Sequence, residues 1–121
     1  TSLFLRVQSL SVSFVETDRV ENNISLKCSW TIQENEVPTE ALLFKNSTLF
    51  YQCFLGNSDV STCLAKPYSP SRFSYLYQEA KNTIRVNIKN MINSDIDFYS
   101  CYVSQQNGTI SLKTLYLPIR T

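Results

Sequence analysis

Histidine is absent from the 121-residue chain, and glycine occurs only at Gly56 and Gly108. Histidine is the commonest general base and the commonest metal ligand of proteins. Glycine-rich loops, in turn, are needed to surround a bound phosphate. The sequence therefore lacks the usual means of acid–base catalysis, metal binding and nucleotide binding. We expect no catalytic residues, no metal site and no cofactor, and we interpret the protein as a non-enzyme.

Long runs of charged or of apolar residues are also missing. The chain has 11 basic and 10 acidic residues and a net charge of +1. Nucleic acids and anionic membranes require a concentrated basic surface, so we expect neither as a partner. No apolar run approaches the roughly 18 residues that cross a bilayer, and the first residues lack the pattern of a signal peptide. We interpret residues 1–121 as one domain, a mature or trimmed segment that does not itself insert into a membrane.

Cysteine is present four times, and no two cysteines form a CxxC pair. Such pairs usually build the four-cysteine zinc sites, and there is no histidine to activate a single reactive thiol. We therefore expect two disulfides, for which four cysteines allow three connectivities. The four residues are Cys28, Cys53, Cys63 and Cys101.

Three sequons for N-glycosylation begin at Asn23, Asn46 and Asn107. Sequons beside paired cysteines indicate a glycoprotein of the oxidising secretory route. We expect the protein to be extracellular, either as the ectodomain of a type I membrane protein at the cell surface or as a secreted protein.

Alternation of apolar and polar residues predicts strands along most of the chain. Residues 23–30 and 82–90 have the period-two pattern of a half-buried strand. A polar turn at 106–109 separates two apolar runs, as in a hairpin. Many short strands without sustained helical periodicity predict an all-β sandwich or barrel. The further strand candidates are 41–55, broken around 45–48, together with 71–77, 98–103 and 110–117.

The segment from Asp95 to Cys101 resembles a signature of immunoglobulin domains. It reads Asp-x-x-x-Tyr-x-Cys, with Tyr99 two residues before the cysteine, where the hydrogen-bonding tyrosine of these domains belongs. The resemblance implies an all-β fold, an immunoglobulin V-type β-sandwich with two antiparallel sheets. It also implies the disulfide Cys28–Cys101 and the salt bridge Arg72–Asp95, since residues 71–73 resemble the start of a strand whose arginine pairs with the motif aspartate.

Immunoglobulin domains usually place a tryptophan on strand C against the central disulfide, but residues 39–46 contain none. The only tryptophan is Trp30, two residues after Cys28. We expect Leu42 or Leu43 to fill the vacant place and to pack against the disulfide between the sheets.

This absence, together with Cys53 and Cys63, resembles the family of T-cell costimulatory receptors, which includes the inducible T-cell costimulator. The resemblance implies a second disulfide, Cys53–Cys63, like the one that leaves strand C′ in that family. The resemblance covers about residues 22–117 and rests on segments 41–53, 82–101 and 107–110. Members that bind butyrophilin-related ligands carry a proline-rich loop where this chain has only 102–106, without proline. Variable-type domains of natural-killer-cell receptors are a second family that the chain resembles.

The resemblance implies the ligand-binding ectodomain of an immune receptor, which recognises a cell-surface protein through the exposed face of strands G, F, C, C′ and C″. It allows a homodimer formed through a stalk outside this chain. The alternative is a secreted or viral immunoglobulin-like decoy that binds and blocks an immune ligand or cytokine. Besides Phe44 and Phe98 on that face, the expected partner-binding residues are Tyr51, Phe54, Tyr102, Ser104, Gln105 and Gln106.

Overall fold

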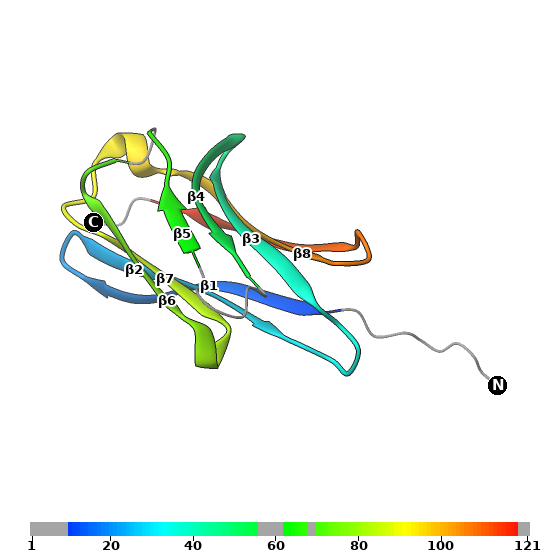
Figure 1. Cartoon of the computed structure of the whole chain (residues 1–121). Helices are drawn as coiled ribbons and strands as arrows, with labels where there is room; N and C mark the ends of the chain where they lie inside the picture. The colour runs from blue at the N-terminus through cyan, green and yellow to red at the C-terminus, as the bar shows by residue number, and fades with distance from the viewer. Residues whose placement is uncertain (1–9, 56–61, 68–69, 119–121) are drawn as a thin grey trace.

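The computed structural model of the chain (Figure 1) describes residues 10–55, 62–67 and 70–118. Its regular structure is almost entirely β, as the alternating sequence predicts. Two one-turn 3-10 helices, η1 (Glu79–Lys81) and η2 (Asn93–Asp95), flank β7. The strands are β1 (Ser11–Val20), β2 (Asn23–Thr31), β3 (Pro38–Lys45), β4 (Thr48–Phe54), β5 (Thr62–Ala65), β6 (Phe73–Gln78), β7 (Thr83–Ile88), β8 (Asp97–Gln105) and β9 (Ile110–Leu117).

The strands form two antiparallel sheets that pack face to face (Figure 1). The smaller sheet has the order β1-β2-β7-β6 and the larger sheet the order β5-β4-β3-β8-β9. This order corresponds to the nine-strand, variable-type arrangement of an immunoglobulin-like sandwich. The predicted all-β sandwich with two antiparallel sheets is confirmed.

The predicted turns lie where polar residues interrupt the alternation. Asn46 begins the turn between β3 and β4, and Gly108 lies in the turn between β8 and β9. Both have a positive φ, 56° at Asn46 and 91° at Gly108. Asparagine and glycine are the residues that most readily adopt this conformation. Both hairpin turns therefore follow from the local sequence.

The core lies between the sheets and consists of the alternate residues of each strand. On β2, β7 and β8 these inward residues are almost completely buried. Burying one large aliphatic side chain contributes about 1.5–3 kcal/mol. Leu43 is paired with Cys101 and fully buried, whereas Leu42 points to the other side of the sheet. Leu43 is thus the residue that takes the place of the missing tryptophan.

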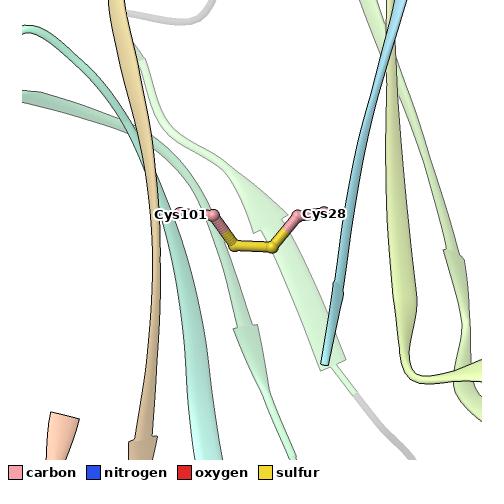
Figure 2. Close-up of a disulfide and its surroundings, with 2 residues drawn as sticks. All are labelled: Cys28 and Cys101. Carbon is pink, nitrogen blue, oxygen red and sulfur yellow. A yellow bond between two sulfur atoms is a disulfide. The ribbon is translucent and has the colours of Figure 1, made fainter. Parts of the chain in front are cut away.

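Both predicted disulfides are present. Cys28 on β2 and Cys101 on β8 join the two sheets through the centre of the core (Figure 2), with their Cα atoms 6.4 Å apart. Cys53 and Cys63 lie directly opposite each other in the β4–β5 ladder and join two strands of the larger sheet. The first bond therefore connects the layers, and the second connects an edge strand to its neighbour.

The Asp95 side chain is buried at the end of the sandwich and is only 1% exposed. Arg72 binds it through two nitrogens, with Nη1–Oδ2 and Nη2–Oδ1 distances of 2.6 and 3.0 Å. The backbone N–H of Ile92 donates to Oδ2 at 2.9 Å. Burial alone would raise the pKa of Asp95, but the hydrogen bonds from Arg72 and Ile92 outweigh it and lower the pKa below its usual value. The predicted Arg72–Asp95 salt bridge is confirmed.

The hydroxyl of Tyr99 donates a hydrogen bond to the backbone oxygen of Asp95 at 2.7 Å. This is the tyrosine corner of immunoglobulin-like folds. Burial raises the pKa of Tyr99 well above its usual value, so the hydroxyl remains a donor throughout the physiological range. The acidic and aromatic residues between 95 and 101 are thus part of the fold's framework.

Tyr99→Phe should lower the free energy of unfolding by about 2 kcal/mol, because a buried carbonyl loses its hydrogen bond while the ring still fills its space. Urea unfolding followed by fluorescence measures the change. The control is Tyr116→Phe, whose ring is half-exposed on the outer side of β9, and which should leave stability within about 0.5 kcal/mol of the original. Equal effects of the two substitutions would contradict this role of the Tyr99 hydroxyl.

Candidate functional site

The outer side of the larger sheet carries a continuous set of apolar side chains, here called the apolar face. The set follows from strand alternation, because residues between the buried ones point away from the core. Phe98 pairs with Tyr116, Tyr102 with Leu112, and Leu42 on β3 lies beside Tyr102. The apolar face consists of Glu40, Leu42, Phe44, Leu49, Gln52, Phe54, Leu64, Phe98, Ser100, Tyr102, Ser104, Ile110, Leu112, Thr114 and Tyr116.

Two aromatic contacts organise this face. The rings of Phe44 and Tyr102 meet edge to face with centroids 5.1 Å apart. The rings of Phe98 and Tyr116 lie 4.8 Å apart. Geometries of this kind add stability beyond area burial and hold the rings in place. The aromatic side chains are therefore held in position before any partner binds.

The most exposed part of the apolar face lies on β8 and β9. Phe98, Ile110, Leu112 and Tyr116 are each between 48% and 57% exposed. Soluble monomers rarely leave a large contiguous apolar patch in water unless it has a binding role. Exposed apolar residues also occur on the smaller sheet, but there Val15 and Leu76 stand among mainly polar neighbours.

Charge is almost absent from the apolar face. Glu40 is its one charged residue, and its Oε2 accepts a hydrogen bond from Gln52 Nε2 at 2.8 Å. The cores of protein–protein interfaces are likewise poor in charge and rich in aromatic residues. The composition of this face thus fits contact with another protein surface.

The structure places several of the expected partner-binding residues together. Phe54, Tyr102 and Ser104 lie on the apolar face, as do Phe44 and Phe98.

Gln106 lies beside this face in the exposed turn between β8 and β9, where its backbone N–H donates to the oxygen of Val37 at 2.8 Å. That bond ties the turn to the segment just before β3.

The expectation for Tyr51 is wrong. Its side chain is 7% exposed and stacks on Tyr75 inside the sandwich, with ring centroids 4.0 Å apart. Tyr51 is two residues from the buried Cys53, so regular alternation along β4 turns both side chains inward. A β-bulge in the β3–β4 ladder, where Leu43 pairs with Tyr51 but Phe44 pairs with Leu49, makes Phe50 the extra residue and leaves Leu49 pointing outward.

The expectation for Gln105 as an exposed contact is also wrong. Gln105 is the last residue of β8 and lies on the inward side with Val103, almost fully buried. Its backbone N–H donates to the oxygen of Thr109 at 2.9 Å, which closes the hairpin. The strand continues two residues further than the sequence suggested, and Gln105 therefore belongs to the sandwich end.

Sequence reasoning missed the contribution of β9. Ile110, Leu112 and Tyr116 supply most of the exposed apolar surface beside β8. Their alternation was visible in residues 110–117, and the register from the 106–109 turn would have placed them opposite Ser104, Tyr102 and Phe98.

The three sequons lie outside the apolar face. Asn23, Asn46 and Asn107 are all exposed and lie at or beside the β1–β2, β3–β4 and β8–β9 turns. The attachment points therefore lie at the two ends of the sandwich, and the apolar face itself carries no sequon.

Comparisons with known proteins assign no family to the chain, since no protein-family model and no curated protein matches it. Neither 3-10 helix in residues 10–55, 62–67 and 70–118 has the length or apolar character to cross a membrane. The same residues bring together no group of three or more cysteine, aspartate or glutamate side chains that could hold a metal ion.

Proposed function

We propose that the protein is the ligand-binding ectodomain of an immune cell-surface receptor, which recognises another cell-surface protein through the apolar face. The observation that carries the proposal is the concentration of exposed aromatic and aliphatic side chains on one sheet with a single charge among them. Tyrosine and phenylalanine in such positions are typical anchors of protein interfaces.

The proposed extracellular location has separate support. The Cys28–Cys101 and Cys53–Cys63 disulfides are typical of oxidising compartments. The sequons at Asn23, Asn46 and Asn107 fit a glycoprotein whose attachment points lie outside the apolar face. The assignment to an immune receptor rests on the resemblance of residues 22–117 to T-cell costimulatory receptors.

A binding screen tests the proposal. The glycosylated domain, multimerised to raise its avidity, is presented to an array of cell-surface ectodomains and soluble cytokines. A butyrophilin-related ligand would support the costimulatory resemblance, and another membrane protein would support a receptor of a different family. Binding to a soluble cytokine alone would contradict the proposed cell-surface ligand and favour a decoy.

Substitutions on the two sheets then locate the contact. Tyr102→Ala, at the middle of the apolar face, should weaken binding of the ligand about 30-fold, which corresponds to roughly 2 kcal/mol at an interface anchor. Surface plasmon resonance measures the change. Leu76→Ala on the outer side of the smaller sheet removes an apolar side chain that is more exposed than Tyr102 and should leave affinity unchanged. A loss of binding with Leu76→Ala, or none with Tyr102→Ala, would sink the assignment of this face.

A further inference from the structure

A groove of about 290 Å³ crosses the outer side of the smaller sheet, on the opposite side of the sandwich from the apolar face. Polar side chains from all four strands line it. In the ladder Asp18 pairs with Ser25, Ser25 with Asn87, and Asn87 with Ser74, so these residues form one row from β1 to β6. Lys89, directly after β7, also lines the groove. The lining is thus built by strand register.

A β-bulge in β1 turns two of its side chains toward this groove. The register of β1 against β2 shifts between Glu16 and Asp18, so that Thr17 is the extra residue. The shift places Asp18 and Val20 on the outer side, opposite Ser25 and Asn23. The exposed Val20 adds an apolar contact beside the polar row.

Several polar groups of the groove have no partner among the described residues. The side chains of Asp18, Ser74 and Lys89 make no hydrogen bond or ion pair within residues 10–55, 62–67 and 70–118. Asn87 uses its Oδ1 to accept from Ser25 Oγ at 2.7 Å, which leaves its Nδ2 donors for another acceptor. The row therefore offers both donors and an acceptor to a neutral polar ligand.

Asn23 lies at the edge of the groove and begins a sequon. Its Oδ1 accepts a hydrogen bond from the backbone N–H of Asn90 at 3.0 Å. This bond orients the amide and leaves Nδ2, the atom that carries an N-linked glycan, free for attachment. The groove thus begins at a point where a sugar can be attached covalently.

We propose that the groove holds the first two N-acetylglucosamine units of an N-linked glycan on Asn23. Two strand spacings, about 10 Å, separate β2 from β6, a span that a disaccharide covers. The sugar carbonyls and hydroxyls accept from Asn87, Ser74 and Lys89, a hydroxyl donates to Asp18, and Val20 contacts an apolar ring face. Because the sugar is tethered, its high effective concentration makes individually weak contacts sufficient.

The inference rests on the proposed extracellular location of the protein and concerns a different surface from the ligand contact. Its consequence is that the Asn23 glycan stabilises the β1-β2-β7-β6 sheet. If the glycan instead extended into water, substituting the side chains of the groove would not change how much glycosylation stabilises the domain. The two arrangements therefore differ in the coupling between the groove side chains and the glycan, which a double-mutant cycle measures.

The test uses the domain from mammalian cells, with glycan occupancy determined by glycopeptide mass spectrometry. In the glycosylated domain, the double substitution Ser74→Ala and Lys89→Ala should lower Tm by about 4 °C. In an Asn23→Gln background, which has no glycan there, the same double substitution should leave Tm unchanged. Ser13→Ala, on the same side of the sheet outside the groove, should have no effect in either background.

Equal effects of the groove substitutions in the two backgrounds would overturn the proposal, and so would an Asn23 that carries no glycan. An unoccupied Asn23 with occupied Asn46 and Asn107 would leave the proposed extracellular function standing. Ligand binding of Asn23→Gln, measured in the same preparation, reports on the apolar face independently. Failure of the groove and failure of the proposed function can thus be told apart.

Discussion

Replacing Cys28 and Cys101 together with alanine should lower the free energy of unfolding by about 4 kcal/mol. The two residues are 73 positions apart in sequence, so their bond removes much of the conformational freedom of the unfolded chain. Single domains are stable by only about 5–15 kcal/mol. The substituted domain should therefore unfold at a much lower concentration of guanidinium chloride, which equilibrium unfolding measures.

The second disulfide provides the matched control. Cys53 and Cys63 are 10 residues apart, and the same loop-closure argument gives about 3 kcal/mol for replacing both with alanine. The interlayer bond should therefore cost more to remove than the bond within the larger sheet. The reverse order would show that loop closure does not govern the stability of this sandwich.

Asp95→Ala should destabilise the domain by about 3 kcal/mol, the next largest effect. The substitution removes the acceptor for Arg72 and for the Ile92 N–H and leaves the arginine without its partner. Because Arg72 is only partly buried, water can solvate its guanidinium once Asp95 is gone. The expected loss of stability therefore lies near the lower end of the range for a broken buried salt bridge. Asp97→Ala, two residues further and partly exposed, should change stability by less than about 1 kcal/mol.

The contribution of Asp95 should also depend on pH in one direction. Its pKa in the folded state lies below the ordinary value of 3.8, so the folded state favours the ionised carboxylate. The stabilisation is complete above the unfolded pKa and is lost as the pH falls through the folded pKa. Urea unfolding of the original domain and of Asp95→Ala should therefore differ fully at pH 7, and the difference should begin to shrink only as the pH falls below about 4. A difference that persists undiminished at pH 2 would contradict the ionised pair.

The features predicted correctly from sequence are those that depend on local pattern or on a short motif. Alternation in 23–30 and 82–90 follows directly from one side of each strand facing the core. The motif ending at Cys101 has a fixed spacing of residues that the fold requires, and it led to the Cys28–Cys101 disulfide and the Arg72–Asp95 pair, whereas Cys53–Cys63 came from the resemblance to costimulatory receptors. Strand β1 (Ser11–Val20) was not predicted, because its bulge and its polar second half disrupt the alternation.

The errors at the candidate site have different causes. Tyr51 has the same parity as the inward Cys53, so strict alternation would have placed it inside, and the bulge that arises from pairing with β3 instead turns Leu49 outward. Gln105 belongs to β8 because β9 and the Thr109 carbonyl extend the hairpin. Neither the extra residue nor the strand end can be derived from composition or periodicity of the segment itself. Side-chain direction near irregular pairing is therefore the least predictable part of the site.

Under the proposed binding role, the single carboxylate of the apolar face has a kinetic consequence. Long-range attraction between opposite charges is what raises protein association rates above about 10⁵–10⁶ M⁻¹s⁻¹, and Glu40 alone supplies little of it. Encounters at this face are then governed by diffusion and orientation, and they are nearly independent of ionic strength. Partners that fit the aromatic pairs differ from those that do not mainly in how slowly they leave. At such a surface, partners are therefore distinguished by the lifetime of the complex rather than by how fast it forms.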